Sequence, residues 1–310
     1  MTGHDRRDDL REEIRAQFDG AKAQFEATSA KLEKRAGRNL FLAIGTGLVF
    51  AALFLVALFV SPWTFAILIA VIVTIALLEL ASAFRVAGRR VPRIGVALGG
   101  IIIVAGAAFF GAEGALLGLF VASLMLVVWR LIEGLVPAWE TPPKTLIRDV
   151  FSGLFSLVYV AFLGSLALLL SHGERGEWWV FALLLLTVSV DTGAYASGVT
   201  LGKHKMTPRI SPNKTWEGFA GAAVAAMIAG IAISLLALNQ PWWVGVILGV
   251  VVLFTATGGD LAESLIKRNL GVKDMSTWIP GHGGFLDRLD SLLPSAVGVY
   301  GVALSLGVFA

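Results

Sequence analysis

Residues 40–60 read LFLAIGTGLVFAALFLVALFV, a run of apolar and small side chains without a charge. As an α-helix rising about 1.5 Å per residue, this run reaches across roughly 30 Å of hydrocarbon. It is too long for the apolar part of a signal peptide, and no clean small-residue cleavage site accompanies it. The run therefore predicts a first transmembrane helix. The charged segment 1–38 before it has a weak helical spacing of apolar residues, which predicts a soluble or surface-lying amphipathic helix.

Eight more apolar runs of similar length follow, and the whole chain is 56% hydrophobic with a mean hydropathy of +0.79. Helices satisfy all their backbone hydrogen bonds inside a bilayer, so we expect an all-α, polytopic membrane protein with about nine transmembrane helices. The nine runs lie near residues 39–60, 63–83, 94–112, 114–135, 150–171, 178–200, 217–237, 242–259 and 289–309. We divide the chain into a charged segment at 1–38, N-terminal spans at 39–175 and a C-terminal catalytic region at 176–310.

The distribution of Lys and Arg predicts the orientation of these spans. With the N-terminus in the cytoplasm, 24 of the 25 basic residues fall in cytoplasmic segments, and only Arg175 lies outside. Because cytoplasmic loops of membrane proteins carry the excess of Lys and Arg, the sequence predicts a cytoplasmic N-terminus and an external C-terminus. The outer loops are short and nearly uncharged, so the active chemistry is expected on the cytoplasmic side.

Composition excludes several classes of site. The chain has no cysteine, which removes disulfides, thiolate metal sites and a thiol nucleophile. The net charge of +3 is spread over short loops rather than gathered on one domain, so we expect no nucleic-acid partner.

No internal repeat is evident, which disfavours a transporter built from duplicated halves without excluding one. The 35 glycines are interpreted mainly as positions of close helix packing.

The densest polar segment lies between the last two spans, where residues 258–290 read GGDLAESLIKRNLGVKDMSTWIPGHGGFLDRLD. It holds five acids, four Lys or Arg and one His. Its glycine-rich turn would let backbone amides approach a phosphate closely. Carboxylates there suit Mg²⁺, and the basic side chains suit phosphates. The candidates are Asp260, Asp287 and Asp290 for the metal side, and Lys267, Arg268, Lys273 and Arg288 for the phosphates. The alternative is a basic loop that meets anionic lipid.

A second polar cluster begins at Asp191, inside an otherwise apolar run, and continues to Gly218. An ionisable group inside a span is a functional candidate by default; the alternative is a structural partner for a buried Lys or Arg. Ser211, Asn213 and Lys214 then supply hydroxyl, amide and ammonium groups just before the next helix, whose N-terminus could bind an anion. Both clusters fall on the cytoplasmic face, so we expect them to meet.

Other charged residues have simpler interpretations. Glu79, Glu113 and Glu133 lie near span ends, where snorkelling or helix capping is expected. His172 and His204 are isolated histidines, which are more often surface groups than ligands.

The segment from Ser264 to Asp290 resembles the signature of the phosphatidate cytidylyltransferase, or CDP-diacylglycerol synthase, family. The resemblance rests on SLIKR at 264–268, KD at 273–274 and PGHGGFLDRLD at 280–290, with their spacing intact. The Asp191 region and SPNKTWEG at 211–218 are similar to the family's preceding segment.

This resemblance implies transfer of a cytidylyl group from CTP to phosphatidic acid, giving CDP-diacylglycerol and pyrophosphate in phospholipid biosynthesis. It maps the family's metal-site carboxylates onto Asp260 and Asp287. It also implies a need for Mg²⁺ and a homodimer, and leaves room for a second, monovalent cation such as K⁺.

We expect Lys214, Lys267, Arg268 and Arg288 to neutralise the triphosphate. Supporting or substrate-binding roles are expected for a further set: Asp191, Ser211, Asn213, Lys273, His282, Gly283, Gly284 and Asp290. Short loops and a single chain favour a bacterial inner membrane. A CTP-dependent lipid kinase is the alternative enzyme, and a membrane transporter is the alternative from another class.

Overall fold

The computed structural model describes all residues except 1–39, 136–141, 273–274, 277–283 and 310. Two compact units divide the chain, 1–53 with 280–282 and 54–279 with 283–310. All packing described below lies within the second unit. The predicted charged segment 1–38 lies outside the described residues, so its amphipathic helix stays a prediction, as does the boundary near residue 176.

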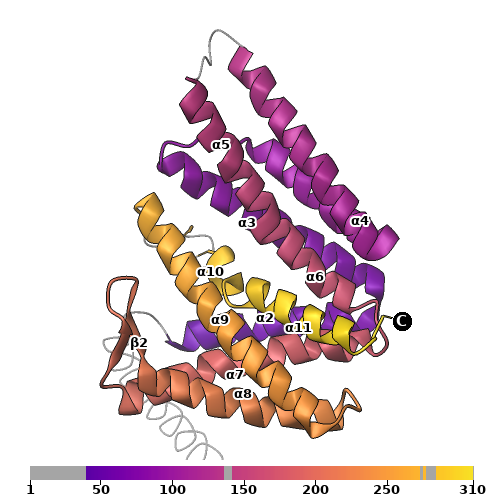
Figure 1. Ribbon diagram of the computed structural model, residues 1–310, viewed down its shortest axis with the longest axis vertical. Coiled ribbons are helices and arrows are strands. Elements are labelled where there is room, and N and C mark those ends of the chain that lie inside the picture. Colours follow the sequence, from indigo (N-terminus) through magenta and orange to yellow (C-terminus); the bar gives the residue numbers. More distant parts are fainter. Residues whose placement is uncertain (1–39, 136–141, 273–274, 277–283, 310) are drawn as a thin grey trace, which may run out of the picture. The chain divides into compact units, whose positions relative to one another are not determined.

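Most of the described chain is helical (Figure 1). The elements in order are α2 (Leu40–Val60), α3 (Pro62–Val86), α4 (Arg93–Leu135), α5 (Pro143–Ser156), the π-helix η2 (Leu157–Phe162), α6 (Leu163–Leu170), α7 (Gly176–Leu201), β1 (Lys205–Thr207), β2 (Ser211–Thr215), α8 (Trp216–Leu236), α9 (Trp242–Leu270), α10 (Leu286–Leu289) and α11 (Leu292–Ser305).

Six helical segments of the described chain are long and apolar enough to cross a membrane. They are α3, α4, the continuous run 143–170, α7, α8 and α9. The chain is therefore a mostly helical protein of integral membrane type. The number differs from nine because α4 covers two expected spans and α11 has only 14 residues. The apolar helix Gly47–Val60 is also short by this measure.

The long helix α4 is broken at Gly111, where φ is 65° and ψ is −145°, a backbone conformation that essentially only glycine adopts. The two arms fold back on each other in close contact. A Cβ at Gly106 would overlap the backbone of Gly114. A Cβ at Gly118 would likewise stand 3.0 Å from the carbonyl oxygen of Ile102. The arms correspond to the expected runs 94–112 and 114–135.

The turn between α2 and α3 follows from its sequence. Ser61 is extended, and its hydroxyl accepts a hydrogen bond from the Thr64 amide at 3.1 Å. The Thr64 hydroxyl accepts one from the Ser61 amide at 3.1 Å, which completes a capping box. Pro62 stands at the first helical position, where its missing N–H is no loss.

Helices α7, α8 and α9 pack against one another in turn through small residues (Figure 1). A Cβ at Gly230 of α8 would overlap the carbonyl of Gly245 on α9. A Cβ at Gly193 of α7 would lie 2.8 Å from the carbonyl oxygen of Gly221 on α8. Close backbone approach thus accounts for these glycines, as the sequence predicted.

The strands β1 and β2 form an antiparallel ribbon that the all-α expectation lacks. Lys205 pairs with Thr215, and Thr207 pairs with Ser211. Pro208 and Pro212 disfavour a helix in this connection, and the hydroxyl-bearing residues around them favour turns and extended backbone. The ribbon leads directly into α8, whose N-cap Thr215 accepts a hydrogen bond from the Gly218 amide at 3.1 Å.

Candidate functional site

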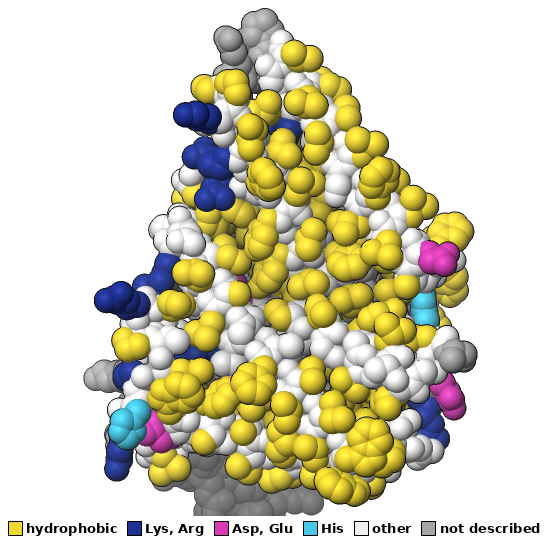
Figure 2. All heavy atoms as spheres, viewed as in Figure 1, with side chains coloured by type: hydrophobic (Ala, Val, Ile, Leu, Met, Phe, Trp, Pro, Cys, Tyr) yellow, Lys and Arg dark blue, Asp and Glu magenta, His cyan; other side chains and the backbone are white. Residues whose placement is uncertain are grey.

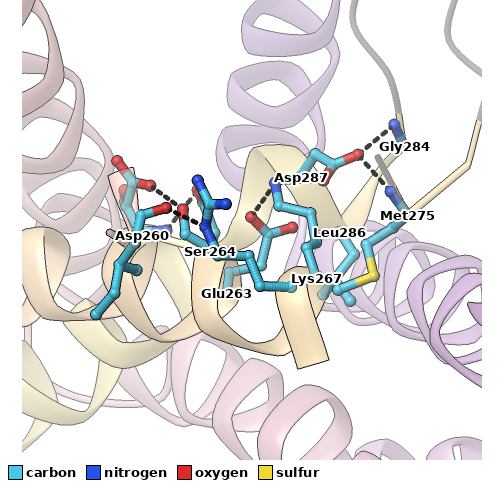
Figure 3. A network of polar contacts seen from close by, with 12 residues as sticks. Asp260, Glu263, Ser264, Lys267, Met275, Gly284, Leu286 and Asp287 are labelled. Carbon is cyan, nitrogen blue, oxygen red and sulfur yellow. Dashed lines mark hydrogen bonds and ion pairs between the residues drawn. The ribbon is translucent and has the colours of Figure 1, made fainter. Parts of the chain in front are cut away.

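Three ionisable side chains share one face of α9 near its C-terminal end. Asp260, Glu263 and Lys267 are spaced at i, i+3 and i+7, which aligns them along a helix (Figure 3). The Nζ atom of Lys267 lies 2.6 Å from Oε2 of Glu263 and 2.9 Å from Oδ1 of Asp287. Glu263 is fully buried, so its contact with Lys267 is shielded from solvent. This face of α9 is the framework of the site.

Asp287 lies on α10 and is held by the backbone of the signature loop. Its Oδ2 accepts hydrogen bonds from the amides of Gly284 at 2.8 Å and Met275 at 3.1 Å (Figure 3). Burial alone would raise the pKa of Asp287, but hydrogen bonds from the Glu263 side chain, the Gly284 amide and Lys267 outweigh it and lower the pKa below its ordinary value. Asp287 is therefore ionised at neutral pH, as a metal ligand or phosphate-site carboxylate must be.

Glu79 of α3 anchors the start of α10. Its carboxylate accepts hydrogen bonds from the amides of Phe285 at 3.0 Å and Leu286 at 2.9 Å, and from the hydroxyl of Ser276. The side chain is only 2% exposed, so the expectation of snorkelling is wrong. Capping is correct, but the capped helix is α10 rather than its own. The position of Glu79 inside an apolar run could have identified it, since an acid within a membrane span is a functional candidate by default.

Lys214 joins the second polar cluster to the first. It stands on β2, and its Nζ lies 2.8 Å from Oδ2 of Asp260 and 3.3 Å from the carbonyl oxygen of Thr257. Arg268 also crosses between the clusters, since its Nε donates to the carbonyl of Ile210 at 2.6 Å. The ribbon before α8 and the end of α9 are thus brought together, as the sequence predicted.

Asp191 reaches the junction between α10 and α11. The Ser291 hydroxyl donates to Oδ1 of Asp191 at 3.4 Å, and the Ser291 amide donates to Oδ1 of Asp290 at 2.7 Å. Across the residues that the structure describes, Asp191 forms no ion pair with a Lys or Arg, so the alternative of a structural salt bridge gains no support. Asp290 is also fixed from α9, because a Cβ at Gly259 would overlap the Asp290 carbonyl.

The other predicted site residues lie on β2, on α10 and in the signature loop. Ser211 and Asn213 lie on β2, and Arg288 lies exposed on α10. Gly284 contributes its amide to Asp287, as described above. Lys273, His282 and Gly283 lie outside the described residues, so their roles stay predictions. Glu263 was missed, although its spacing from Asp260 and Lys267 on one helix face could have identified it.

The donors present suit a metal ion that is shared with substrate. Asp260 and Asp287 each contact a lysine, yet a carboxylate offers about four lone-pair positions and keeps capacity for a further ligand. The buried Oε1 of Glu263 has no hydrogen-bond partner within the described ranges. No group of three or more His, Asp or Glu among those residues could hold a metal alone. Mg²⁺ in phosphate chemistry needs only one or two carboxylates with water and substrate oxygens.

Comparison with known proteins assigns the chain to a family. A phosphatidate cytidylyltransferase of Mycobacterium bovis is 37% identical over 286 residues, which cover 91% of this chain and 92% of that protein. One of Mycobacterium leprae is 38% identical over 277 residues, covering 87% and 89%. One of Brucella suis is 39% identical over 149 residues, covering 48% and 54%. Residues 42–306 match the cytidylyltransferase family over most of the chain, and the protein belongs to that family.

Proposed function

We propose that this membrane protein is a nucleotidyltransferase that makes CDP-diacylglycerol and pyrophosphate from CTP and phosphatidic acid. Relatives that bear the name phosphatidate cytidylyltransferase and align over nine-tenths of the chain support this activity. The structural observation that supports this activity is a pair of lysine–carboxylate contacts along α9. Lys214 contacts Asp260, and Lys267 contacts Asp287. Such pairs provide both charge types that a metal-assisted reaction of phosphates requires.

The reaction needs little covalent chemistry from the protein. An oxygen of the phosphatidate phosphomonoester attacks the α-phosphorus of CTP, a new P–O bond forms, and the bond to the β-phosphate breaks to release pyrophosphate. The phosphomonoester is already mostly deprotonated near neutral pH, because the second pKa of a phosphate monoester is about 6. No general base is therefore assigned. The protein's part is to position the two substrates and neutralise their charge.

We assign the phosphates to the basic residues of the site. Lys214 and Lys267 are half-buried and lie within ion-pair distance of carboxylates, so they are fixed in place. Arg268 and Arg288 add charge at the ends of α9 and α10. Asp191, Asp290, Ser211 and Asn213, with Lys273, His282, Gly283 and Gly284 of the signature loop, are proposed as supporting substrate contacts.

Asp260 and Asp287 are the proposed Mg²⁺ ligands. The ion would supply charge neutralisation at the triphosphate, beyond what the lysines provide. K⁺ as a second cation and a homodimeric assembly belong to the same proposal, on the strength of the family resemblance.

We also propose nine spans, a cytoplasmic N-terminus, an external C-terminus and a cytoplasm-facing site in a bacterial inner membrane. Figure 2 shows most of the visible Lys and Arg along one edge, while apolar side chains cover much of the remaining face. This one-sided charge agrees with the 24 to 1 split in the sequence. Labelling of cysteines introduced singly at positions 205 and 175 in intact cells tests it. Modification of 205 from outside, with 175 protected, would reverse the orientation.

The decisive test of activity uses purified protein, phosphatidic acid, Mg²⁺ and CTP labelled at the α or the γ phosphate. Attack at the α-phosphorus sends the α label into lipid and the γ label into pyrophosphate. A CTP-dependent lipid kinase sends the γ label into lipid and leaves the α label in CDP. A transporter does neither. Lipid that carries γ label without α label would overturn the proposed function.

A further inference from the structure

A cavity of about 420 Å³ lies beside the site, on the neighbouring face of α9. Residues of α3, α5 and α9 line it together with Arg89 from the turn after α3. Its size falls within the range of about 300 to 1,000 Å³ that is usual for small-molecule sites. Two features decide what it could hold, namely its two guanidinium groups and its aromatic rings.

Among the residues that the structure describes, neither guanidinium group has an acidic partner closer than 4.0 Å. Arg89 donates to the Ser152 hydroxyl at 3.1 Å and lies 5.4 Å from the centre of the Phe84 ring. Arg148 donates to the carbonyl oxygen of Gly88 at 2.8 Å. Asp149 lies 4.0 Å from Arg148, but Arg130 binds that carboxylate more closely, at 2.8 Å. Both arginines therefore retain N–H donors and positive charge for an anion, for which arginine is well suited.

Two of the aromatic rings, Phe151 and Phe155, belong to α5, part of a segment that is apolar and long enough to span a membrane. Phe151 is 68% exposed and Phe155 is 39% exposed, although both line the cavity. Aromatic side chains that stand open on a membrane helix meet lipid rather than water. An anion-binding pair of arginines next to lipid-facing rings is complementary to one chemical class, a phosphate head group that carries acyl chains.

Two residues of the cavity lining, Ile266 and Phe155, lead towards the proposed catalytic site. Ile266 lines the cavity and directly precedes Lys267, the partner of Asp287. Phe155 stacks on Tyr159, with ring centres 5.2 Å apart and planes 11° apart. Tyr159 lies in the π-helix η2 and is 8% exposed. Its hydroxyl has no hydrogen-bond partner in the described part of the chain. π-Helical turns often occur at functional sites.

We propose that this cavity binds the substrate lipid: Arg89 and Arg148 hold the phosphate of phosphatidic acid, and Phe151 and Phe155 contact its acyl chains. The lipid would then approach the carboxylates of α9 along the Phe155–Tyr159 stack. This inference rests on the proposed function for the identity of the lipid. It adds residues outside the signature segments, at the turn after α3 and on α5.

Arg148→Gln is the first test, because this side chain is 46% exposed and its close contact is to a backbone carbonyl. Losing a charge-assisted hydrogen bond should raise the KM for phosphatidic acid about tenfold or more, with the KM for CTP unchanged. Arg89→Gln should act in the same direction. Lys144→Gln is the matched control, since Lys144 lies one turn earlier on α5, is exposed and does not line the cavity. An unchanged KM for phosphatidic acid in Arg148→Gln would overturn the inference, as would equal effects in Lys144→Gln.

A binding measurement separates this inference from the proposed function. Photoreactive phosphatidic acid in detergent should crosslink to α5 of the wild-type protein, and Arg148→Gln should weaken the crosslink while Lys144→Gln preserves it. Unlabelled phosphatidic acid should compete, whereas inorganic phosphate or glycerol 3-phosphate should compete only at far higher concentration. Crosslinking at α5 without CDP-diacylglycerol synthesis would remove the proposed function and leave the lipid site. Synthesis without crosslinking at α5 would do the reverse.

Discussion

Replacing Glu79 by Gln tests whether a buried acid on α3 positions the catalytic loop. Oε1 of Glu79 accepts from Ser276 and the Phe285 amide, and Oε2 accepts from the Leu286 amide. Glutamine has one acceptor oxygen, and its NH₂ group must face at least one of these donors. At least one hydrogen bond is therefore lost at a side chain that is 2% exposed.

The magnitude follows from the kind of bond that is lost. A hydrogen bond to a charged group contributes about 1.5 to 3 kcal/mol, and a buried unpaired donor adds its own desolvation cost. If about 2 kcal/mol falls on the placement of α10, the equilibrium constant for correct placement of Asp287 falls about 30-fold. We expect kcat for α-label transfer to fall by up to that factor, together with a weaker response to Mg²⁺.

The assay compares initial rates across a Mg²⁺ titration, with thermal unfolding in detergent measured in parallel. Glu113→Gln is the control, since Glu113 is an exposed acid within an apolar run of α4. Glu79→Asp should restore part of the activity, because it keeps both acceptor oxygens on a shorter side chain. If Glu79→Gln lowered thermal stability but kept kcat and its Mg²⁺ dependence within threefold of wild type, the positioning role would be refuted.

Three further predictions concern the site itself. Asp260→Asn and Asp287→Asn should each abolish turnover while the purified proteins stay monodisperse; near-normal activity in either across a Mg²⁺ titration would remove it from the metal site. Lys214→Gln should raise the KM for CTP about tenfold, through loss of a charged phosphate contact, and an unchanged KM would exclude that contact. Gly259→Ala should cost about 1 to 3 kcal/mol and lower activity, because its Cβ would overlap the Asp290 carbonyl, whereas Gly258→Ala, with no atom within 4 Å of its Cβ, should be silent.

The sequence predicted the helical membrane architecture because long apolar runs have one common solution in a bilayer. It also predicted that the two polar clusters meet, from the side of the membrane on which each loop falls. The Lys214–Asp260 pair and the Arg268–Ile210 contact bear this out. The doubling back of α4 at Gly111 matches the two separate runs expected there.

The missed features depend on contacts between distant segments. Glu79 precedes its partner Leu286 by 207 positions, and no local pattern encodes that pairing. Glu263 lies in a charge-rich segment, where composition does not distinguish one acid from another. Its spacing from Asp260 and Lys267 on one helix face is the property that identifies it. The β1–β2 ribbon forms where turn-favouring residues outweigh helix propensity. The spacing of apolar residues, from which the helices were predicted, carries no information on this balance. The individual roles assigned to the site residues remain predictions.

Glycine contacts between helices fix the register of α9, and this register determines where Asp260 and Lys267 lie. The pairs Lys214–Asp260 and Lys267–Asp287 join α9 to elements on either side, with N–O separations of 2.8 and 2.9 Å. Sliding a helix by one residue moves its side chains by about 1.5 Å and turns them by about 100°, which would break both pairs. Small residues that lock backbones together resist such a slide, as Gly230 and Gly245 do between α8 and α9. The close glycine contacts between α8 and α9 therefore fix the helix register that places Asp260 beside Lys214.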